Sequence, residues 1–296
     1  MADDNFSFNP KSEALRKHKT VNIVMRSHND IDVIQRTIDG ILSQKYQDFD
    51  ILNFDNDSTD GTLEIIKKYP RIKSYNIPAG MYTPGYVLNR AIEVSNCDIL
   101  VFNNSDSVPL SDDWLSTLIA PISEGKAVAV YARQVPRKNA YIWVRQDYGR
   151  CFGDVEFKRN FFSLASSAMS SEIFKTMKFD EKITFSEDVK LANKLRDMGK
   201  VVLYVPNAHA EHSHNYTIAQ TRRRFEGEGV ADALIYGSKQ NFFAFVKGLI
   251  GGFLRDGIYV ATFGKISDLI PCLQHRAIQK WSYYKARRDA FKNLKK

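Results

Sequence analysis

The stretch FDILNFDNDSTDGT (residues 49–62) joins an apolar run, a polar loop and the start of a helix in one short segment. Residues 49–54 have the apolar content of a buried strand, and residues 62–69 read as a helix. A strand that leads through a loop into a helix is half of a βαβ unit. The segment therefore predicts an α/β fold if the same alternation continues on both sides.

The alternation does continue in both directions along the chain. We expect further strands at 21–25, 74–77, 98–102, 127–133 and 201–205. We expect helices at 85–95 and 187–198, the second capped by Ser186 and ended by Gly199. One more helix has its apolar face on Ile31, Ile34, Ile38, Ile41 and Leu42. The pattern predicts a Rossmann-like, mostly parallel central sheet.

From residue 217 onward the pattern becomes all-helical. Apolar residues fall at helical spacing at Phe242, Phe245, Val246, Leu249, Phe253 and Leu254. We therefore predict a polar N-terminal segment at 1–20, an α/β domain at 21–230 and a helical C-terminal region with a basic tail at 231–296.

The charge of the chain is concentrated at one end. The net charge is +8, and residues 275–296 hold eight Lys and Arg residues against one acidic residue. The rest of the chain is near neutral, which disfavours a nucleic-acid cleft through its body and suggests an anionic surface beside the tail. The three cysteines are far apart, which indicates free thiols in a reducing compartment. No apolar run predicts a signal peptide or a membrane span.

Polar clusters follow two of the predicted strands directly. In open α/β sheets, ligands bind at the carboxyl ends of the strands. After the strand at 49–54, Asp55 is placed to accept an N–H of a nucleobase. After the strand at 98–102, Asn104 and Asp106 offer oxygens to a divalent cation on a diphosphate. The alternatives are a helix-capping loop, with Ser58 or Asp60 as the cap, and an ordinary polar turn.

Three later clusters could complete a site. Glu187 or Asp188 can act as a general base, or can simply complement the positive end of a helix. His212 and His214 can ligate a metal, or can be ordinary core or surface histidines. Arg222–Arg224 can bind a diphosphate, or can form a solvated helix face.

The order of these segments resembles that of family 2 glycosyltransferases of the GT-A fold. Residues 21–30 and 55–62 match the opening of the family pattern, Asn104-Ser105-Asp106 stands where the family has Asp-x-Asp, and Glu187-Asp188 stands where it has Glu-Asp. Residues 133–136, 162–170, 212–216 and 220–229 are similar to segments of bacterial rhamnosyltransferase-type members. The resemblance covers residues 20–230.

The resemblance implies an inverting glycosyltransferase of surface polysaccharide biosynthesis, of the kind that builds capsule or O-antigen. Its donor would be a nucleotide-diphosphate sugar, dTDP-rhamnose or a UDP-sugar, and its acceptor a glycan or a lipid-linked saccharide. The implied base is Asp188 with Glu187 beside it. The implied donor-binding residues are Arg26, Ser27, Asp55, Asp57, Asn104, Arg222, Arg223 and Arg224. The implied ligands of Mg²⁺ or Mn²⁺ are Asp106, His212 and His214.

The chain departs from the family pattern at two places. Asn56 and Asp57 replace two usual residues, one of them Gly, so we expect a different turn before Ser58. Asn104 replaces the first Asp of Asp-x-Asp, which predicts weaker metal binding. The Gln-x-x-Arg-Trp signature of processive synthases does not occur.

Two other functions compete with this interpretation. A nucleotidyltransferase on a similar sheet would need a Gly-rich phosphate loop, and residues 26–30 contain none. A non-catalytic sugar-binding module would not need Asp106, Asp188 and His212 to meet in one pocket.

The C-terminal helices suggest a location as well as a fold. An apolar face at 242–254 followed by a basic tail is typical of a segment that lies on a membrane surface. The same face could instead pack on the chain's own core or on a second copy in a homodimer. We therefore expect a cytoplasmic enzyme, peripheral on the inner face of the plasma membrane.

Overall fold

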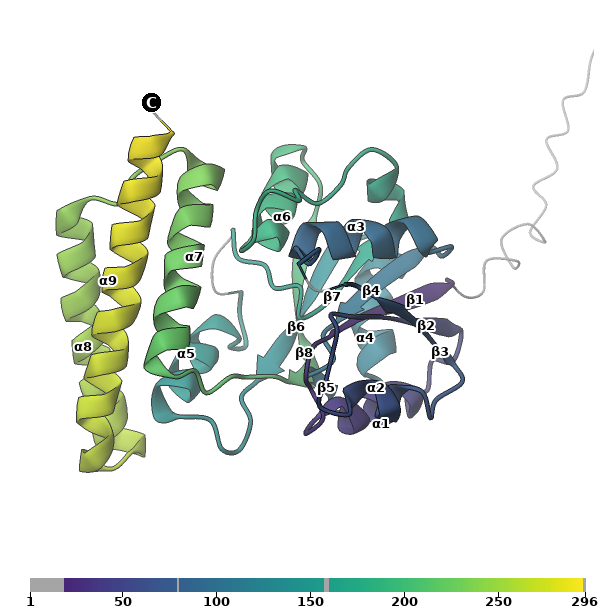
Figure 1. The fold of residues 1–296 in the computed structure, drawn as a ribbon, viewed down its shortest axis with the longest axis horizontal. Coiled ribbons are helices and arrows are strands. Elements are labelled where there is room, and N and C mark those ends of the chain that lie inside the picture. Colours follow the sequence, from purple (N-terminus) through teal and green to yellow (C-terminus); the bar gives the residue numbers. More distant parts are fainter. Residues whose placement is uncertain (1–18, 79, 157–159, 295–296) are drawn as a thin grey trace, which may run out of the picture.

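The computed structural model describes residues 19–78, 80–156 and 160–294. An α/β body lies beside a layer of long helices that runs across one end of it (Figure 1). The polar segment predicted at 1–20 lies almost wholly outside the described residues.

The centre of the body is a mixed sheet in the order β3-β2-β1-β4-β7-β6-β8-β5. Its first four strands in that order are parallel, whereas β7 runs antiparallel to both of its neighbours. The strands are β1 (Val21–Ser27), β2 (Phe49–Asp55), β3 (Ile72–Asn76), β4 (Ile99–Asn103), β5 (Val108–Pro109), β6 (Ala129–Val135), β7 (Ser166–Ser170) and β8 (Val202–Glu211).

Alternation along the central strands divides the core into two layers. Ile23 of β1 and Val101 of β4 pack with α1 (Ile34–Leu42) and α4 (Trp114–Ser123) on one face of the sheet. Val24 and Phe102, one position on, pack with α3 (Pro84–Val94) and α6 (Glu187–Asp197) on the other face. Successive strand residues point to opposite faces, so these strands are apolar on both sides, as buried parallel strands require.

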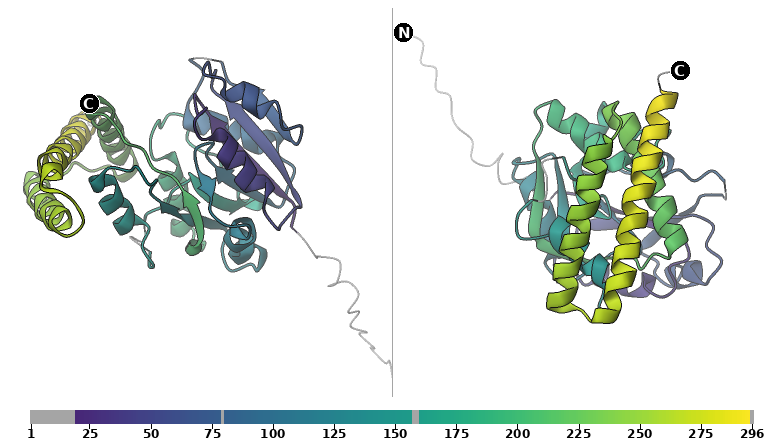
Figure 2. Two further views of the ribbon diagram at one scale, coloured as in Figure 1. Left: turned by 90° about the horizontal axis from the view of Figure 1, so that it is seen from below. Right: turned by 90° about the vertical axis from the view of Figure 1, so that its left-hand side faces the viewer.

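The helical layer consists of α7 (Ile218–Tyr236), α8 (Phe242–Phe263) and α9 (Leu269–Asn293), with the short 3₁₀ turn η2 (Ile266–Asp268) before α9. Helix α7 lies along α9, and the two backbones approach closely at Gly229, where a Cβ atom would stand 2.5 Å from the Tyr283 carbonyl oxygen. In Figure 2 (right), α8 and α9 form the outermost layer. Helix α7 crosses the boundary predicted at 230, so the helical layer begins earlier in the chain.

The other helices of the body are short. They are α2 (Thr62–Ile66) and α5 (Ile142–Cys151), with a 3₁₀ turn η1 (Ser171–Lys175) after β7. No helix of the part of the chain described here is long and apolar enough to cross a membrane.

The predicted α/β alternation is confirmed, with differences at particular residues. Ile31 lies in a turn before α1 and is 43% exposed, so it does not extend the buried face of that helix. Ser186 stands at the N-terminus of α6 as expected, but at φ 59° it makes no side-chain capping bond. The prediction that Ser186 caps this helix is therefore wrong, because its left-handed backbone directs the hydroxyl elsewhere. Phe242 and Leu254 of α8 are 55% and 64% exposed, so the apolar face predicted there is not all core.

Candidate active site

Arg26 connects three of the predicted clusters at one edge of the sheet. It lies near the carboxyl end of β1, and its Nη2 donates to Oδ1 of Asn104 at 2.9 Å, just past the end of β4. Its Nη1 lies 3.8 Å from Oε1 of Glu187, the first residue of α6. The edge where β1, β2 and β4 end is therefore where the predicted site residues meet, as expected for an open α/β sheet.

Asp55 orders the loop after β2 rather than facing open space. Its side chain is fully buried. Its Oδ1 accepts the Ser58 backbone N–H at 2.8 Å, and its Oδ2 accepts the hydroxyls of Ser27 and Ser58, each at 2.7 Å. Both Asp55 oxygens are thus engaged within the protein. Near the start of α2, Asp60 accepts the Thr62 backbone N–H at 3.0 Å, whereas Ser58 bonds back to Asp55.

Asp57 takes the position where the family pattern has Gly. Its φ of 58° is the left-handed conformation that Gly adopts freely and that Asp tolerates better than most residues. Asp57 therefore adopts a backbone conformation that is open to Gly, and the expectation of a different turn stays a prediction. Asp57 is exposed, so it is the carboxylate of this loop that a ligand can reach.

Asp106, His212 and His214 bring three potential metal ligands together. The Nε2 atoms of the two histidines are 3.2 Å apart, and they lie 3.5 Å and 3.4 Å from the two carboxylate oxygens of Asp106. Ligands held about 2.1 Å from one ion at tetrahedral or octahedral angles lie roughly 3.0–3.4 Å apart. Among the described residues, this is the group of His, Cys, Asp and Glu side chains that could hold a metal ion.

Burial and hydrogen bonding prepare the histidines as metal ligands. Burial lowers the pKa of His212 to about 4, although Asp106 acts in the opposite direction, and burial likewise lowers the pKa of His214. The amide of Gln134 is oriented by donating to Ser163 at 2.6 Å, and its oxygen lies 2.8 Å from Nδ1 of His212. The Nδ1–H of His212 therefore donates to Gln134, which leaves the Nε2 lone pair directed at Asp106. This outer support is typical of metal-binding histidines.

Arg137 is a member of the site that the sequence did not indicate. Its Nη2 donates to the Asp106 carbonyl oxygen at 2.8 Å and lies 3.3 Å from Oδ2 of the same residue, and its Nε is buried without a partner. Its backbone N–H donates to the Ser213 hydroxyl at 2.9 Å, which ties this loop to the histidine segment. Burial alone would raise the pKa of Asp106, but the histidines and Arg137 hold it below its usual value.

Glu187 and Asp188 begin α6 as a close pair of carboxyl groups. Glu187 is buried and Asp188 is half-buried. Oδ2 of Asp188 accepts the Leu164 N–H at 2.9 Å and Oδ1 accepts its neighbour's N–H at 2.8 Å, so the group is held in one orientation. Burial raises the pKa of both carboxyl groups, and Arg26 opposes that rise. A fixed carboxylate with a raised pKa suits a general base.

The three predicted arginines of α7 do not act as one cluster. Arg222 is exposed and pairs with Glu226 of its own helix at 2.9 Å. Arg224 donates to the Tyr216 hydroxyl at 3.0 Å, and the Tyr216 ring stacks on His214 at 5.1 Å between centroids. Arg224 also pairs with Glu228 of its own helix at 3.0 Å, and Arg223 and Arg224 are both exposed, so its contact with Tyr216 is what connects Arg224 to the metal group. Residues 100° apart around a helix cannot all face one ligand.

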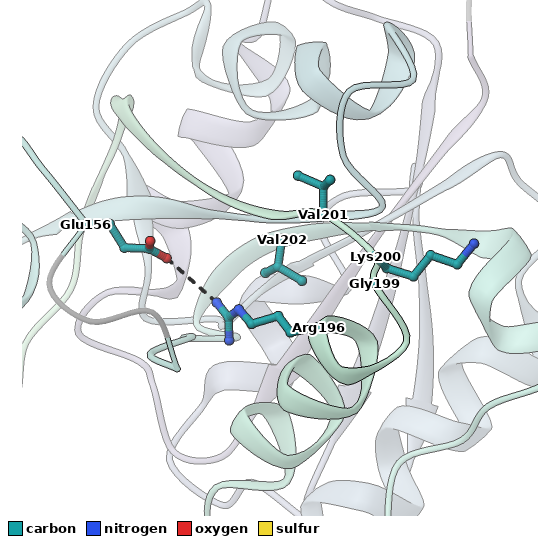
Figure 3. Close-up of a pocket in the computed structure, with 6 residues that line it drawn as sticks. All are labelled: Glu156, Arg196, Gly199, Lys200, Val201 and Val202. Atoms are coloured by element: carbon teal, nitrogen blue, oxygen red, sulfur yellow. Dashed lines mark ion pairs between the residues drawn. The ribbon is translucent and has the colours of Figure 1, made fainter.

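A separate pocket lies at the other end of β8 (Figure 3). It is lined by Glu156, Arg196, Gly199, Lys200, Val201 and Val202. Figure 3 shows Glu156 and Arg196 facing each other, 3.7 Å apart. β8 spans ten residues between Val202 and Glu211, so at about 3.3 Å per residue this pocket is roughly 30 Å from the histidines. It belongs to no predicted site.

Known glycosyltransferases resemble this chain over most of its length. The model of the family described as "Glycosyl transferase family 2" matches residues 22–180. The O-antigen chain rhamnosyltransferase RfbN of Salmonella typhimurium is 24% identical over 282 residues, which cover 88% of this chain and 90% of RfbN. The O-antigen chain rhamnosyltransferase WbaN of Salmonella anatum is 26% identical over 259 residues, covering 80% and 82%.

Solved structures share the fold at low identity. The mannosyltransferase PcManGT from Pyrobaculum calidifontis, in complex with GDP-Man and Mn²⁺, superposes with a TM-score of 0.61 at 16% identity, covering 94% of this chain and 87% of that one. S. aureus TarS 1–349 in complex with UDP-GlcNAc gives a TM-score of 0.57 at 15% identity, covering 93% and 92%. These similarities confirm the predicted GT-A fold.

Proposed function

From the premise that this chain belongs to glycosyl transferase family 2, we propose that it transfers rhamnose, with inversion, from a nucleotide-diphosphate donor to a growing surface polysaccharide. Family membership makes the protein a glycosyltransferase and sets aside the nucleotidyltransferase and the non-catalytic sugar-binding module. The curated relatives, both O-antigen chain rhamnosyltransferases, favour dTDP-rhamnose over a UDP-sugar as donor and an O-antigen-like glycan or lipid-linked saccharide as acceptor.

The observation that carries the proposal is the convergence of Asp106, His212 and His214 at the strand edge that also bears Arg26 and Asp188. A diphosphate needs concentrated positive charge, and a bound divalent cation stabilises the charge that develops on a departing phosphate oxygen. Two imidazole nitrogens beside one carboxylate suit Mn²⁺ better than Mg²⁺, which prefers oxygen ligands. We propose Mn²⁺ as the ion that these three residues hold.

The chain's own residues have separate tasks in this mechanism. Asp188 takes the proton of the acceptor hydroxyl as that hydroxyl attacks the anomeric carbon from the face opposite the nucleotide. Arg137 adds positive charge beside the diphosphate through the guanidinium that contacts Asp106, and Arg224 adds charge from α7. Arg26 lies between Asn104 and Glu187, the neighbour of the base, so it positions both. Asp57, the exposed carboxylate of the loop, contacts the nucleobase, while Asp55 and Ser27 hold that loop in place.

The domain division and the location complete the proposal. We propose that residues 21–217 form the glycosyltransferase unit, because α7, which begins at Ile218, packs with the helical layer. Within the described residues, Cys97, Cys151 and Cys272 form no disulfide, which fits a cytoplasmic enzyme. We propose that the enzyme meets its acceptor at the inner face of the plasma membrane, to which it binds through α8 and α9.

A donor panel tests this function directly. The protein is mixed with dTDP-rhamnose, UDP-sugars and GDP-sugars, with and without Mn²⁺, and its unfolding temperature and donor hydrolysis are measured. A ligand at 100 times its Kd stabilises by about 2.7 kcal/mol, so a clear shift is expected with dTDP-rhamnose in the presence of the ion. A response to another sugar nucleotide alone would overturn the donor, and no response to any nucleotide would overturn the function.

A further inference from the structure

A continuous apolar stripe runs along the outer side of α8. Phe243, Ile250, Leu254 and Ile258 are 81%, 54%, 64% and 68% exposed. Their spacing of seven, four and four residues places them on one face of the helix. The opposite face of α8 is the one that packs inward, with Phe245, Gly252, Asp256 and Val260 buried. The helix is therefore apolar on both sides, and only one side is covered by the described part of the chain.

The stripe is also shaped as a shallow groove. A pocket on α8 is lined by Phe243, Val246, Lys247, Ile250, Gly251 and Leu254. Helix α8, which carries these residues, lies in the outermost layer of the molecule (Figure 2, right). A large exposed apolar patch on a water-soluble domain marks a surface that another body covers.

The charge around the apolar stripe indicates which kind of partner covers it. Residues 239–294 contain ten Lys and Arg residues and three acidic ones. None of the three acids is free: Asp256 is buried against Arg276, Asp268 accepts the Lys265 N–H, and Asp289 pairs with Lys292. Arg276 and Lys292 are used in these ion pairs, and Arg287 pairs with Asp232, which leaves seven basic residues against Asp268. The charge around the apolar stripe is therefore positive.

The neighbouring helix α9 adds a basic stripe to the same layer. Trp281, Lys285, Arg288 and Lys292 are exposed at spacings of four, three and four residues, so they share one face of the helix. The Trp281 ring lies 5.9 Å from that of Phe245, which is on the covered face of α8, so the basic stripe begins where the two helices of this layer contact each other. Aromatic and basic side chains next to an apolar helix face are the composition of helices that lie in the interface of an anionic membrane.

We propose that the outer face of α8, with the basic stripe of α9, docks this protein onto an anionic lipid bilayer. The apolar stripe enters the headgroup region, and Lys247, Lys285 and Arg288 meet lipid phosphates. A second copy of the chain is the less favourable occupant, because it would bring two strongly basic faces together. The docking does not depend on which sugar the enzyme transfers, so it can fail without the proposed function failing.

Vesicle flotation tests the docking. The full chain is mixed with vesicles of phosphatidylglycerol and phosphatidylethanolamine, and in parallel with vesicles of phosphatidylcholine alone, at low and high salt. We expect binding to the anionic vesicles only, weakened by salt. We expect Ile250→Ser with Leu254→Ser, and separately Lys285→Glu with Arg288→Glu, to weaken it about tenfold or more. Both pairs are exposed, so the fold should survive, which equal donor hydrolysis verifies.

The matched control is Met198→Ser, which removes an apolar side chain that is 54% exposed on the α/β body. It should float like the unchanged chain. Light scattering without lipid identifies the competing occupant. A dimer that Ile250→Ser with Leu254→Ser converts to a monomer, with no flotation of the unchanged chain, would assign the face to a second copy and overturn the proposal. Equal flotation of all variants would overturn it as well.

Discussion

Two buried clusters of charged residues in this molecule differ in how completely their hydrogen-bonding atoms are paired. One surrounds Arg276, which is 2% exposed. Its guanidinium donates to both oxygens of Asp256, to both oxygens of Asp147 and to Gln279, at 2.6–3.1 Å. The other is Asp106 with its two histidines, in which the nearest contacts are 3.2–3.5 Å and two ring nitrogens face each other.

The difference separates a structural cluster from a binding one. Every donor of Arg276 has an acceptor in the chain, so nothing is left to bind a ligand, and the cluster joins α8 and α9 to α5 of the body. In the histidine cluster, the two Nε2 atoms and the Asp106 carboxylate converge at 3.2–3.5 Å, and the donor that reaches the carboxylate is Arg137 at a long 3.3 Å, which is an arrangement that a cation can complete. Burial of charge is common to both, so burial alone does not identify a site, whereas unsatisfied and convergent ligand atoms do.

The largest expected effect is on turnover at the candidate active site. Asp188→Asn should lower kcat by about 10²–10⁴, because a positioned base contributes a factor of that size. Donor binding, measured by calorimetry, should survive, because Asp188 acts on the acceptor. Turnover close to that of the unchanged enzyme would remove Asp188 from the role of base.

On the structural side, Asp256→Asn should lower the free energy of unfolding by about 3–5 kcal/mol, because it leaves the buried Arg276 partly uncompensated. Urea denaturation measures this. The matched substitution Asp106→Asn should lower the free energy of unfolding much less, since the Asp106 carboxylate is not held by short hydrogen bonds. If the two variants lost equal stability, the two clusters would not differ as described.

For stabilisation by Mn²⁺, the order of these two variants should be reversed, with Asp106→Asn affected more than Asp256→Asn. Mn²⁺ at 100 times its Kd should raise the unfolding free energy of the unchanged chain by about 2.7 kcal/mol. Asp106→Asn and His214→Ala should abolish the response, and Asp256→Asn should retain it. The readout is thermal unfolding in the presence of Mn²⁺ or a chelator, without any donor. An undiminished response in Asp106→Asn would place the ion elsewhere.

A smaller effect is expected at Arg137, the residue shared between the carboxylate and the diphosphate. Arg137→Met should weaken binding of a nucleoside diphosphate by roughly tenfold, because one charge-assisted contact is lost. This corresponds to about 1.4 kcal/mol of binding free energy. Arg222→Met is the control, since that side chain pairs with Glu226 on the exposed side of α7. Calorimetry that finds equal losses for both variants would contradict the assignment.

The smallest effect concerns pH. Burial raises the pKa of Asp188, so its base form should disappear, as pH falls, at a higher pH than the usual aspartate value of about 3.9. Arg26 opposes that rise, so Arg26→Met should move the acid limb of kcat/KM to higher pH. A limb that moves to lower pH, or stays in place, would show that Arg26 does not act on the base.

Much of the site could be predicted because its residues follow directly after strands that local sequence patterns reveal. Apolar runs determine the strands, and in this sheet the polar residues that follow β2 and β4 fall at one edge. Roles within the loops were harder to predict. Asp55 looked like the ligand contact, yet the hydroxyls of two serines donate to it, and Asp57 adopts a left-handed conformation. β7 was missed because its five residues, SSAMS, lack the β-branched and aromatic side chains typical of strands.

By itself, the sequence determined the α/β alternation, the order of the polar clusters and through them the family, since these depend on periodicity and spacing along the chain. Only the tertiary structure decided which charged groups are satisfied. Arg137 meets Asp106 across 31 residues, and Arg276 meets Asp147 across 129. Contacts at such separations arise from packing of whole elements, so no local pattern distinguishes the cluster that holds the fold together from the one that can hold an ion.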